Sequence, residues 1–547
     1  MAAQTNRSWL TDAVIYEIYP QSFQDSNGDG IGDLRGVIDR LDYIASLGVD
    51  AIWFNPCFES PFVDAGYDVS DYLRVAPRYG SNDDLIELVD KARERGIRII
   101  LDLVAGHTSI EHAWFQEELH ASGPNPAGDR YIWRTDEPAA GWAEDIPGMP
   151  AWVASPGPRP GWYLKNFYDE QPALNFGWVN PEAGLGWRDA VDAPGPQRNR
   201  QAMQDILDFW LSKGVAGFRV DMAFSLVKDE GLFEGWIASA QIWQDIREWL
   251  DDAYPDAVLI PEGEEPRTGA PLAFDADFAL VIHAPHASLF DNHGAGDLPW
   301  HTRMEPFFGA EGKGSTALFL DTWAMYREVD PQRRVLLASA DHDFSRLRCG
   351  SRTPEQLGAA FTFLFTFGTV PSLYYGDEIG MRYLPGMPNV EGAVCNPLYN
   401  RAGARTPMQW DDSANAGFST AAADALYLPI DPDPDRPTVA AQDGVPGSTL
   451  TLVRDLLALR RRTPALQGHA PTTVLHPGYP FVFRRGDDHL VVVNPRQASA
   501  SFGTDEFAGW TPLFGQGVAL TEGGIEADGF GYAIFARDHV TADDVTA

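Results

Sequence analysis

The sequence predicts an α/β protein: a parallel (β/α)₈ TIM barrel with a subdomain inserted after the third strand and a C-terminal antiparallel β-sandwich domain. Three observations support this prediction. Eight short apolar runs recur along the chain, and helical patterns such as 34–48 and 81–96 lie between them. A long stretch rich in Gly, Pro and Trp separates the third run from the fourth. From about residue 465, the pattern changes to alternating strands with turn residues.

The apolar runs are typical of parallel strands buried on both faces, because they are continuous rather than alternating and helices separate them. The eight runs are VIYEIYP (14–20), AIWFNP (51–56), RIILDLV (98–104), GFRVDM (217–222), AVLIPE (257–262), FALVIH (278–283), RVLLASA (334–340) and SLYYGDE (372–378). Eight such strands match a barrel. We assign residues 1–107 and 181–464 to the barrel, 108–180 to the inserted subdomain and 465–547 to the C-terminal domain.

Composition narrows the class of protein. The 547 residues are 44% hydrophobic, enough for a large core, and carry a net charge of -37. Such an acidic surface disfavours nucleic acid and anionic membranes and suits a neutral small-molecule substrate. Cys57, Cys349 and Cys395 have no zinc-type spacing, and so sparse a set fits a reducing compartment.

The expected location is the cytoplasm, because the N-terminal residues lack an apolar signal region and no run approaches the length of a membrane span. The sequence is compatible with a monomer or a homo-oligomer.

Charged residues stand where several predicted strands end. Arg219 and Asp221 lie two apart in one strand and therefore share a face. Asp102 ends the third predicted strand, Glu262 ends the fifth, and the run Asp341 to Asp343 follows the seventh. The carboxyl ends of barrel strands meet at one rim, where barrel enzymes place their active sites. We therefore expect these side chains to converge there, although any one of them alone is also typical of a structural ion pair.

Converging carboxylates indicate acid–base and nucleophilic chemistry on a neutral substrate. An ionised carboxylate attacks an anomeric carbon, and a protonated one protonates the leaving oxygen. The two roles need separate pKa values. We expect Arg219 to hold Asp221 charged and oriented.

The motifs resemble those of the α-amylase superfamily, glycoside hydrolase family 13. The resemblance rests on DLVAGHTS (102–109), GFRVDM (217–222), the Glu after AVLIP, DHD (341–343), SFQDSNGDGIGDLRG (22–36), DAGYDVSDY (64–72), PSLYYGDEIGM (371–381), QPALN (171–175) and ARTPMQWDDS (404–413). The motifs occur in the family's order along nearly the whole chain. QPALN and ARTPMQW are similar to the oligo-1,6-glucosidase and α-glucosidase branch.

The resemblance implies a role for each matching residue. Asp221 matches the nucleophile and Asp343 the third carboxylate, which grips sugar hydroxyls. The other matches are sugar-binding residues: His107 and His342 for hydroxyls, Tyr67 as the platform, Asp64 and Arg401 as the pair closing the pocket, and Phe167 and Gln171 as further lining. We add Asp102 and Arg219 to the substrate-binding set. A charged clamp at the end of the pocket blocks longer chains, which implies exo cleavage.

The general acid has three candidates in PEGEEP, namely Glu262, Glu264 and Glu265. The family usually shows Gly-Glu after an apolar strand, which taken literally selects Glu264. Counting along the strand selects Glu262, with Pro261 in the place of the family's Gly. We favour Glu262 because it lies directly at the strand end.

A structural cation is implied by the segment DSNGDGIGD. Its oxygen-bearing side chains alternate as in an EF-hand loop, with Gly at the tight turn. The resemblance implies Ca²⁺, or Mg²⁺ in its place, at Asp25, Asn27, Asp29, the Ile31 carbonyl and Asp33. The alternative is a metal-free turn.

Several residues depart from the family's motifs. Gly106 replaces an Asn that commonly precedes the motif His, Asp341 replaces an Asn found in many relatives, and Ala173 replaces an Asp. Met222, which follows the nucleophile, matches neither the Val that tends to accompany α-1,6 preference nor the smaller residues of α-1,4 enzymes. Ala402 and Gly403, near the leaving-group side, depart as well. We expect a standard glucose pocket and an unusual leaving-group side.

The prediction is a retaining, exo-acting α-glucosidase. The first alternative is a glucosyltransferase or isomerase of the same family, as in trehalose synthase or sucrose isomerase. The second is an inactive carbohydrate-binding protein, which the retained carboxylates argue against.

Overall fold

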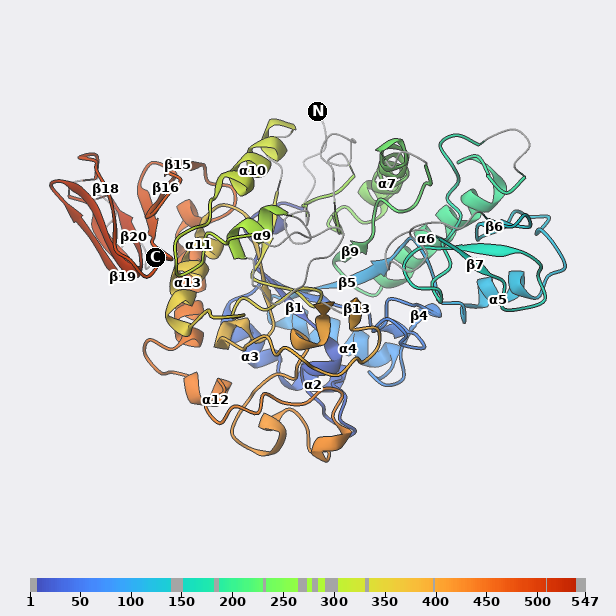
Figure 1. Ribbon diagram of the computed structural model, residues 1–547, viewed down its shortest axis with the longest axis horizontal. Coiled ribbons are helices and arrows are strands. Elements are labelled where there is room, and N and C mark those ends of the chain that lie inside the picture. Colours follow the sequence, from blue (N-terminus) through green and yellow to red (C-terminus); the bar gives the residue numbers. More distant parts are fainter. Residues whose placement is uncertain are drawn as a thin grey trace.

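The computed structural model describes residues 7–138, 151–181, 186–229, 233–263, 273–277, 284–290, 304–329, 334–396, 399–507 and 509–537. Its centre is a curved parallel sheet in the order β10-β9-β5-β2-β1-β12-β11 (Figure 1). The strands are β1 Ile15–Ile18, β2 Ala51–Phe54, β5 Arg98–Val104, β9 Gly217–Asp221, β10 Val258–Pro261, β11 Leu336–Ala338 and β12 Val370–Tyr374. Seven of the eight predicted strands are confirmed.

The remaining predicted strand, 278–283, which is the sixth in chain order, lies outside the described residues. The chain just before it joins the two edges of the sheet. The backbone N–H of Asp275 donates to Leu259 of β10, and Asp277 pairs in parallel with Val335 beside β11. The ring of strands therefore closes through residues 275–277, as a barrel requires.

Helices surround the barrel. They are α1 Trp9–Asp12, α2 Leu34–Asp39, α3 Leu41–Leu47, α4 Asn82–Glu94, α5 Ala113–Leu119, α6 Pro194–Leu211, α7 Phe233–Ala253, α9 Ala284–Phe290, α10 Ala317–Val329, α11 Leu357–Thr366, α12 Val439–Gln442 and α13 Thr449–Arg462. The pattern at 81–96 folds as α4, capped by Ser81 and Asp84 in a reciprocal capping box. The pattern at 34–48 forms two helices that meet at Arg40, whose ψ of 4 departs from helical geometry.

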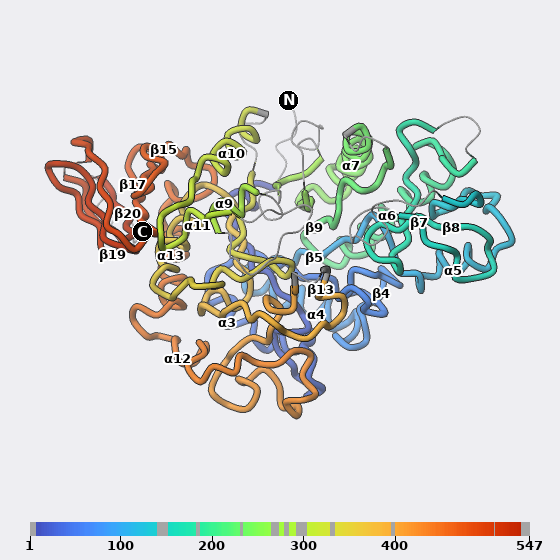
Figure 2. The backbone as a smooth tube through the Cα atoms, viewed as in Figure 1, coloured from blue at the N-terminus to red at the C-terminus, as the bar shows by residue number. Residues whose placement is uncertain are grey.

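Two smaller parts flank the barrel (Figures 1 and 2). On one side, β6 Trp133–Arg134, β7 Ala151–Ala154 and β8 Trp162–Lys165 form an antiparallel sheet in the order β6-β8-β7, between β5 and β9 in the chain. On the other side lies the antiparallel C-terminal domain, β15 Thr472–His476, β16 Phe481–Arg485, β17 His489–Val493, β18 Ala500–Phe502, β19 Thr511–Thr521 and β20 Gly524–Ala536. The insertion and the antiparallel C-terminal domain are both confirmed.

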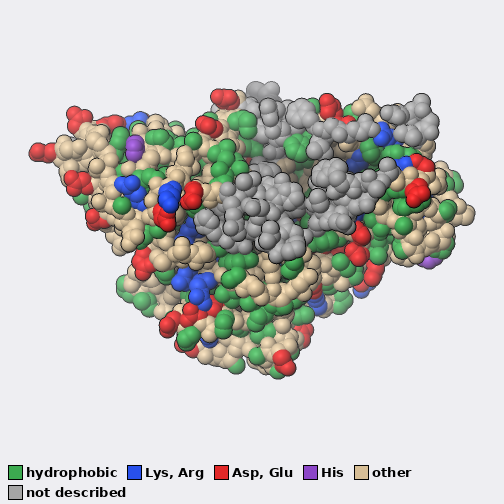
Figure 3. All heavy atoms as spheres, viewed as in Figure 1, with side chains coloured by type: hydrophobic (Ala, Val, Ile, Leu, Met, Phe, Trp, Pro, Cys, Tyr) green, Lys and Arg blue, Asp and Glu red, His purple; other side chains and the backbone are tan. Residues whose placement is uncertain are grey.

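Two short antiparallel strand pairs complete the described architecture. They are β3 Phe58–Glu59 with β4 Asp71–Val75, and β13 Val394–Asn396 with β14 Tyr399–Asn400. Within the described ranges, no helix combines the length and apolar character needed to cross a membrane. On the face shown in Figure 3, acidic side chains are scattered, with basic groups among them.

In each barrel strand, alternate residues point to opposite faces. Side chains such as Ile15, Trp53, Ile100 and Val258 form one cluster inside the ring. Their neighbours in sequence, such as Leu101, pack in the larger cluster with the surrounding helices. Because alternate residues share a face, the inner face continues beyond the apolar residues to the polar ones at the strand ends.

Candidate active site

The inward positions at the strand ends carry charged side chains. By parity, Asp102 follows Ile100, and Glu262 follows Val258 and Ile260 on the inner face. Arg219 and Asp221 occupy the matching positions of β9, where both are buried. The predicted convergence is therefore present, and it follows from the shared register of neighbouring parallel strands, in which Asp102 pairs with Arg219.

The guanidinium of Arg219 lies at the centre of three carboxylates. Its Nη1 is 2.8 Å from Asp102 Oδ1 and 3.0 Å from Asp221 Oδ1, and its Nη2 is 2.8 Å from Glu262 Oε2. The backbone N–H of Met222 also donates to Glu262 at 3.1 Å. One cation thus orients both members of the predicted nucleophile and acid pair.

Burial and charged neighbours shift the pKa values of Asp221 and Asp102. Burial and the neighbouring Glu262 raise the pKa of Asp221. Arg219 lowers this pKa, as predicted from the sequence, but its effect is smaller than theirs. Burial likewise raises the pKa of Asp102 to about 6, although Arg219 opposes this shift. Asp221 and Glu262 are in hydrogen-bond contact, so the pKa of Asp221 depends on this neighbour as well as on burial.

A chain of buried polar groups runs from β1 to the pocket. Glu17 Oε1 is 2.8 Å from His342 Nδ1, and His342 Nε2 is 2.7 Å from the hydroxyl of Tyr67. The same hydroxyl lies 3.2 Å from Asp102 Oδ2. The rings of Tyr67 and His342 stack with centroids 5.4 Å apart. Burial holds the pKa of His342 far below its usual range, so the ring is a neutral hydrogen-bonding group.

Asp343 is held as an anion by the groups around it. Its Oδ1 is 3.0 Å from Arg401 Nη1 and 2.9 Å from Arg405 Nη2. Burial would raise the pKa of Asp343, but His342, Arg401 and Arg405 together bring it below its usual range. A carboxylate of this kind is suited to accept hydrogen bonds from sugar hydroxyls.

A second carboxylate, Asp341, lies just behind this group. Its Oδ1 accepts the backbone N–H groups of Asp343 and Phe344. Burial and the charge of Asp343 raise the pKa of Asp341 to about 8. Asp341 is therefore a neutral acid near pH 7, which suits the position where many relatives carry Asn.

The far end of the pocket is closed by an ion pair. Arg401 Nη2 is 2.9 Å from Asp64 Oδ1, and both side chains are only 5% exposed. Gln171 donates to Asp64 Oδ2 at 3.0 Å. The hydroxyl of Tyr168 and Nη2 of Arg401 both donate to the carbonyl of Gly392. Side chains from three distant segments thus form one wall.

These elements enclose one cavity. It is lined by Asp64, Tyr67, His107, Phe167, Asp221, Met222, Glu262, Asp343 and Arg401. The set contains the predicted nucleophile, the favoured acid and the third carboxylate, and Met222 was singled out as a departure. Asp102, Gln171, Arg219 and His342 stand directly behind this lining and contact its members. The alternative acids Glu264 and Glu265 lie outside the described residues.

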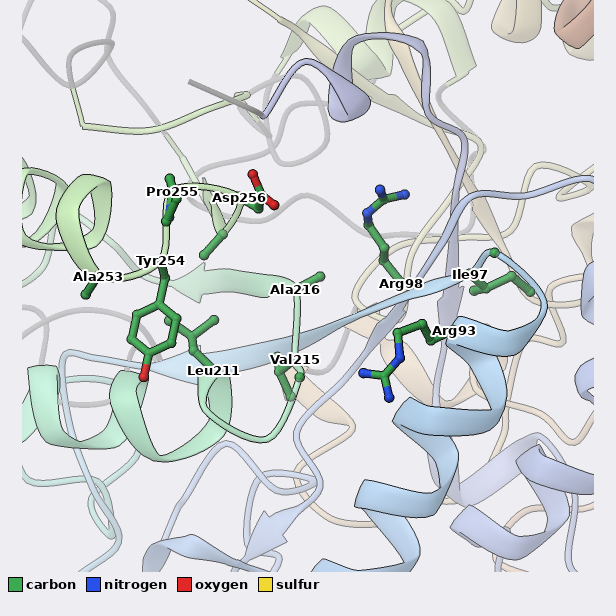
Figure 4. Close-up of a pocket in the computed structure, with 13 residues that line it drawn as sticks. Arg93, Ile97, Arg98, Leu211, Val215, Ala216, Ala253, Tyr254, Pro255 and Asp256 are labelled. Carbon is green, nitrogen blue, oxygen red and sulfur yellow. The ribbon is translucent and has the colours of Figure 1, made fainter. Parts of the chain in front are cut away.

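A larger cavity lies at the opposite end of the barrel, by the starts of β5, β9 and β10 (Figure 4). Its volume is about 520 Å³, and Arg93, Arg98, Leu211 and Tyr254 are among the side chains on its walls. None of the predicted site residues lines it. In a parallel barrel this end serves stability and the other end serves chemistry, so size alone does not identify the active site.

The predicted cation loop is ordered by its own oxygens. Asp25 accepts the backbone N–H groups of Asn27, Gly28 and Gly30, and Asp29 accepts that of Ile31. Asp33 caps α2. The all-oxygen donor set suits a hard cation such as Ca²⁺.

In the described residues, however, no three His, Cys, Asp or Glu side chains gather as a metal cluster. To bind an ion, the side-chain oxygens of the loop would have to give up hydrogen bonds to backbone N–H groups and turn toward the ion. The cation therefore stays a prediction.

Several contributors were missed in the sequence. Glu17 and Asn55 contact His342 from the ends of β1 and β2, and Arg405 contacts Asp343. Strand parity could have found the first two, because each stands at an inward position after an apolar run. Arg405 lies within ARTPMQW and had no such signal.

Comparisons with known proteins agree with this geometry. The family model for the alpha amylase catalytic domain matches residues 17–468. The chain is 33% identical to a trehalose synthase/amylase of Mycolicibacterium smegmatis, over 84% of this chain and 77% of that protein. It is 30% identical to the oligo-1,6-glucosidase of Parageobacillus thermoglucosidasius, over 89% and 90% of the two chains.

A solved structure gives the same result. The trehalulose synthase of Pseudomonas mesoacidophila superimposes with a TM-score of 0.78 at 28% identity, covering 96% of this chain and 99% of that one. Relatives named oligo-1,6-glucosidase and alpha-glucosidase support the predicted branch. The chain therefore belongs to the alpha-amylase family of glycoside hydrolases, in its oligo-1,6-glucosidase and α-glucosidase branch.

Proposed function

We propose that the protein is a retaining, exo-acting α-glucosidase that releases α-glucose from the non-reducing end of small α-glucosides. The observation that carries the exo assignment is the buried pair of Arg401 and Asp64, which closes the pocket 2.9 Å apart. A sugar chain cannot pass through this wall. The glycosidic bond that is cleaved must therefore lie one sugar unit from the non-reducing end of the substrate.

The arrangement of carboxylates supports a double displacement. Retaining enzymes keep their two carboxyl groups close, whereas inverting enzymes leave room for a water molecule between them. Asp221 and Glu262 bind the same guanidinium and touch each other, which favours the retaining class. Asp221 attacks C1, Glu262 protonates the leaving oxygen, and a covalent β-glucosyl-aspartate forms. Water deprotonated by Glu262 then releases α-glucose.

The loop at 25–33 would hold Ca²⁺ or Mg²⁺ in a structural role. The retaining steps use carboxyl groups alone, so the cation would stabilise the loop that precedes α2. The substrate is a neutral glucoside, and we propose action in the cytoplasm.

The test is a proton NMR time course on maltose, isomaltose, sucrose, trehalose, kojibiose and nigerose. Appearance of α-glucose ahead of mutarotation is expected, and the disaccharide that disappears identifies the linkage. Appearance of β-glucose first would overturn the retaining mechanism. A new disaccharide without free glucose would favour the glucosyl-transfer alternative, which the names of the trehalose and trehalulose synthase relatives also suggest.

A further inference from the structure

The missing side chain at Gly106 leaves a space that other residues fill. A Cβ atom on Gly106 would lie 2.3 Å from Ser225 Oγ and 2.8 Å from Asn166 Nδ2. Contacts this short do not occur in folded proteins, so Gly106 and its two neighbours are mutually dependent. In the family, Asn commonly stands at this position. Here an amide reaches the same place from the loop after β8.

Asn166 lies in a polar cluster with the buried residues His107 and Lys228 and the partly buried Ser225. It is 1% exposed, and its Nδ2 is 3.1 Å from His107 Nδ1 and 3.2 Å from Ser225 Oγ. Its Oδ1 accepts a hydrogen bond from Lys228 Nζ at 3.2 Å. Lys228 also donates to the Ser225 carbonyl. Among these partners, only Lys228 contacts the amide oxygen.

The lysine determines which way the amide faces. Burial lowers the pKa of Lys228 to about 7, and its Nζ also donates to the Ser225 carbonyl. In the ammonium form Nζ has donors and no acceptor, so the amide atom beside it is oxygen. The amide nitrogen of Asn166 then faces His107, whose Nδ1 must accept. The ring proton of His107 therefore sits on Nε2, which is 3.1 Å from the carbonyl of Tyr67. Burial lowers the pKa of His107 to about 3, so the ring stays neutral.

We propose that Asn166 is a positioning residue that takes the place of the side chain absent at Gly106 and, with Lys228, fixes His107 as its Nε2–H tautomer. The Nε2–H bond then ties His107 to Tyr67, so that two residues lining the sugar cavity move as one unit. The activity readout rests on the proposed glucosidase function. The tautomer readout needs no substrate.

The first experiment is NMR of the full chain labelled with ¹⁵N-histidine, with His107→Gln used to assign the signal. Wild type is expected to show an unprotonated Nδ1 and a protonated Nε2 at His107. A protonated Nδ1 in wild type would overturn the proposal.

The decisive variant is the isosteric Asn166→Asp. Its carboxylate pairs with Lys228 but offers His107 Nδ1 only an acceptor, so Nδ1 is expected to become protonated, either by transfer of the proton from Nε2 or as an imidazolium, because the Tyr67 carbonyl still accepts from Nε2. An unchanged tautomer in the folded variant would overturn the proposal. If Asn166→Asp does not fold, Lys228→Met removes the orienting donor, and mixed tautomers at His107 are expected. Lys213→Met, at the barrel end away from the cavity, is its matched control and should leave the His107 signals unchanged.

Kinetics then separate positioning from packing. Asn166→Ala is expected to lower kcat/KM on a small glucoside at least tenfold. The triple variant Gly106→Asn, Asn166→Ala, Ser225→Ala, which also removes the hydroxyl 2.3 Å from the new Cβ, should recover part of that loss by returning an amide to the space. If both variants fold and kcat/KM does not recover, the proposal that Asn166 replaces a side chain at position 106 is contradicted. If wild type shows the Nε2–H tautomer but turns over no glucoside, the inference about Asn166 is supported and the proposed function is refuted.

Discussion

Arg401 and Asp64 lie 337 positions apart in the chain, yet they form a buried ion pair of 2.9 Å that closes the sugar cavity. Breaking a buried pair by removing one partner leaves an uncompensated charge, which typically costs about 3–5 kcal/mol. The pair therefore links the stability of the pocket wall to the length of substrate that fits.

Opening this wall should change substrate length. In Arg401→Ala, we expect the ratio of kcat/KM for a trisaccharide to that for a disaccharide to rise about tenfold, equivalent to about 1.4 kcal/mol. Asp343 also loses a cation, so overall activity should fall. Initial rates on both substrates check this. Arg461→Ala, at an exposed position of α13, is the control, and an unchanged ratio in Arg401→Ala would refute the exo assignment.

The two carboxylates should respond differently to the leaving group. Asp221→Asn should lose activity on every glucoside, because no nucleophile remains. Glu262→Gln should lose about 10²–10⁴-fold on disaccharides, the usual contribution of a general acid. It should lose far less on 4-nitrophenyl glucoside, whose leaving group needs no proton. Glu264→Gln is the matched control. A large loss there, with Glu262→Gln active, would move the acid to Glu264.

Asp341 should make stability depend on pH. Its pKa is raised from an unfolded value near 3.8 to about 8, so the folded protein holds the proton more tightly. The stability gained from this group is present below pH 3.8 and is lost as pH rises toward 8. Asp341→Asn keeps an oxygen for both backbone N–H groups without ionising. Urea unfolding from pH 5 to 9 should show a flatter profile for the variant, whereas parallel profiles would contradict the raised pKa.

Calcium should stabilise the protein through the loop at 25–33. Dialysis against chelator should lower Tm, and added Ca²⁺ should restore it in proportion to the logarithm of its concentration. Asp29→Asn should remove this response while leaving the Tm of the chelated protein nearly unchanged, because Asp29 is exposed. Elemental analysis should find bound cation in wild type. A Tm that ignores both chelator and Ca²⁺ would support the metal-free turn.

The sequence was most informative where one strand dictates geometry. The spacing of Arg219 and Asp221 predicted a shared face, and the shared register of β5 and β9 then places Asp102 beside Arg219. Glu17 obeys the same parity and was overlooked, because a single charged residue in an apolar strand is just as typical of a structural ion pair.

Contacts between loops could not be predicted in this way. The amide of Asn166 reaches His107 from 59 positions away, and Lys228 reaches Asn166 from 62. Neither contact has a periodic signal, because each depends on how the inserted subdomain packs over the barrel. The split between α2 and α3 at Arg40 was missed because both helices bury the same apolar pattern.

The cavity is lined by residues from the rigid barrel strands and by residues from the surrounding loops. Asp221 and Glu262 stand at the ends of barrel strands, where neighbouring strands fix their backbone. Phe167 comes from the inserted segment, and Arg401 comes from a segment near residue 400 that follows the last barrel strand. Residues of these segments can therefore change without displacing Asp221 and Glu262. Laboratory evolution toward new leaving groups should therefore accumulate substitutions in the rim loops, with the reaction chemistry inherited intact.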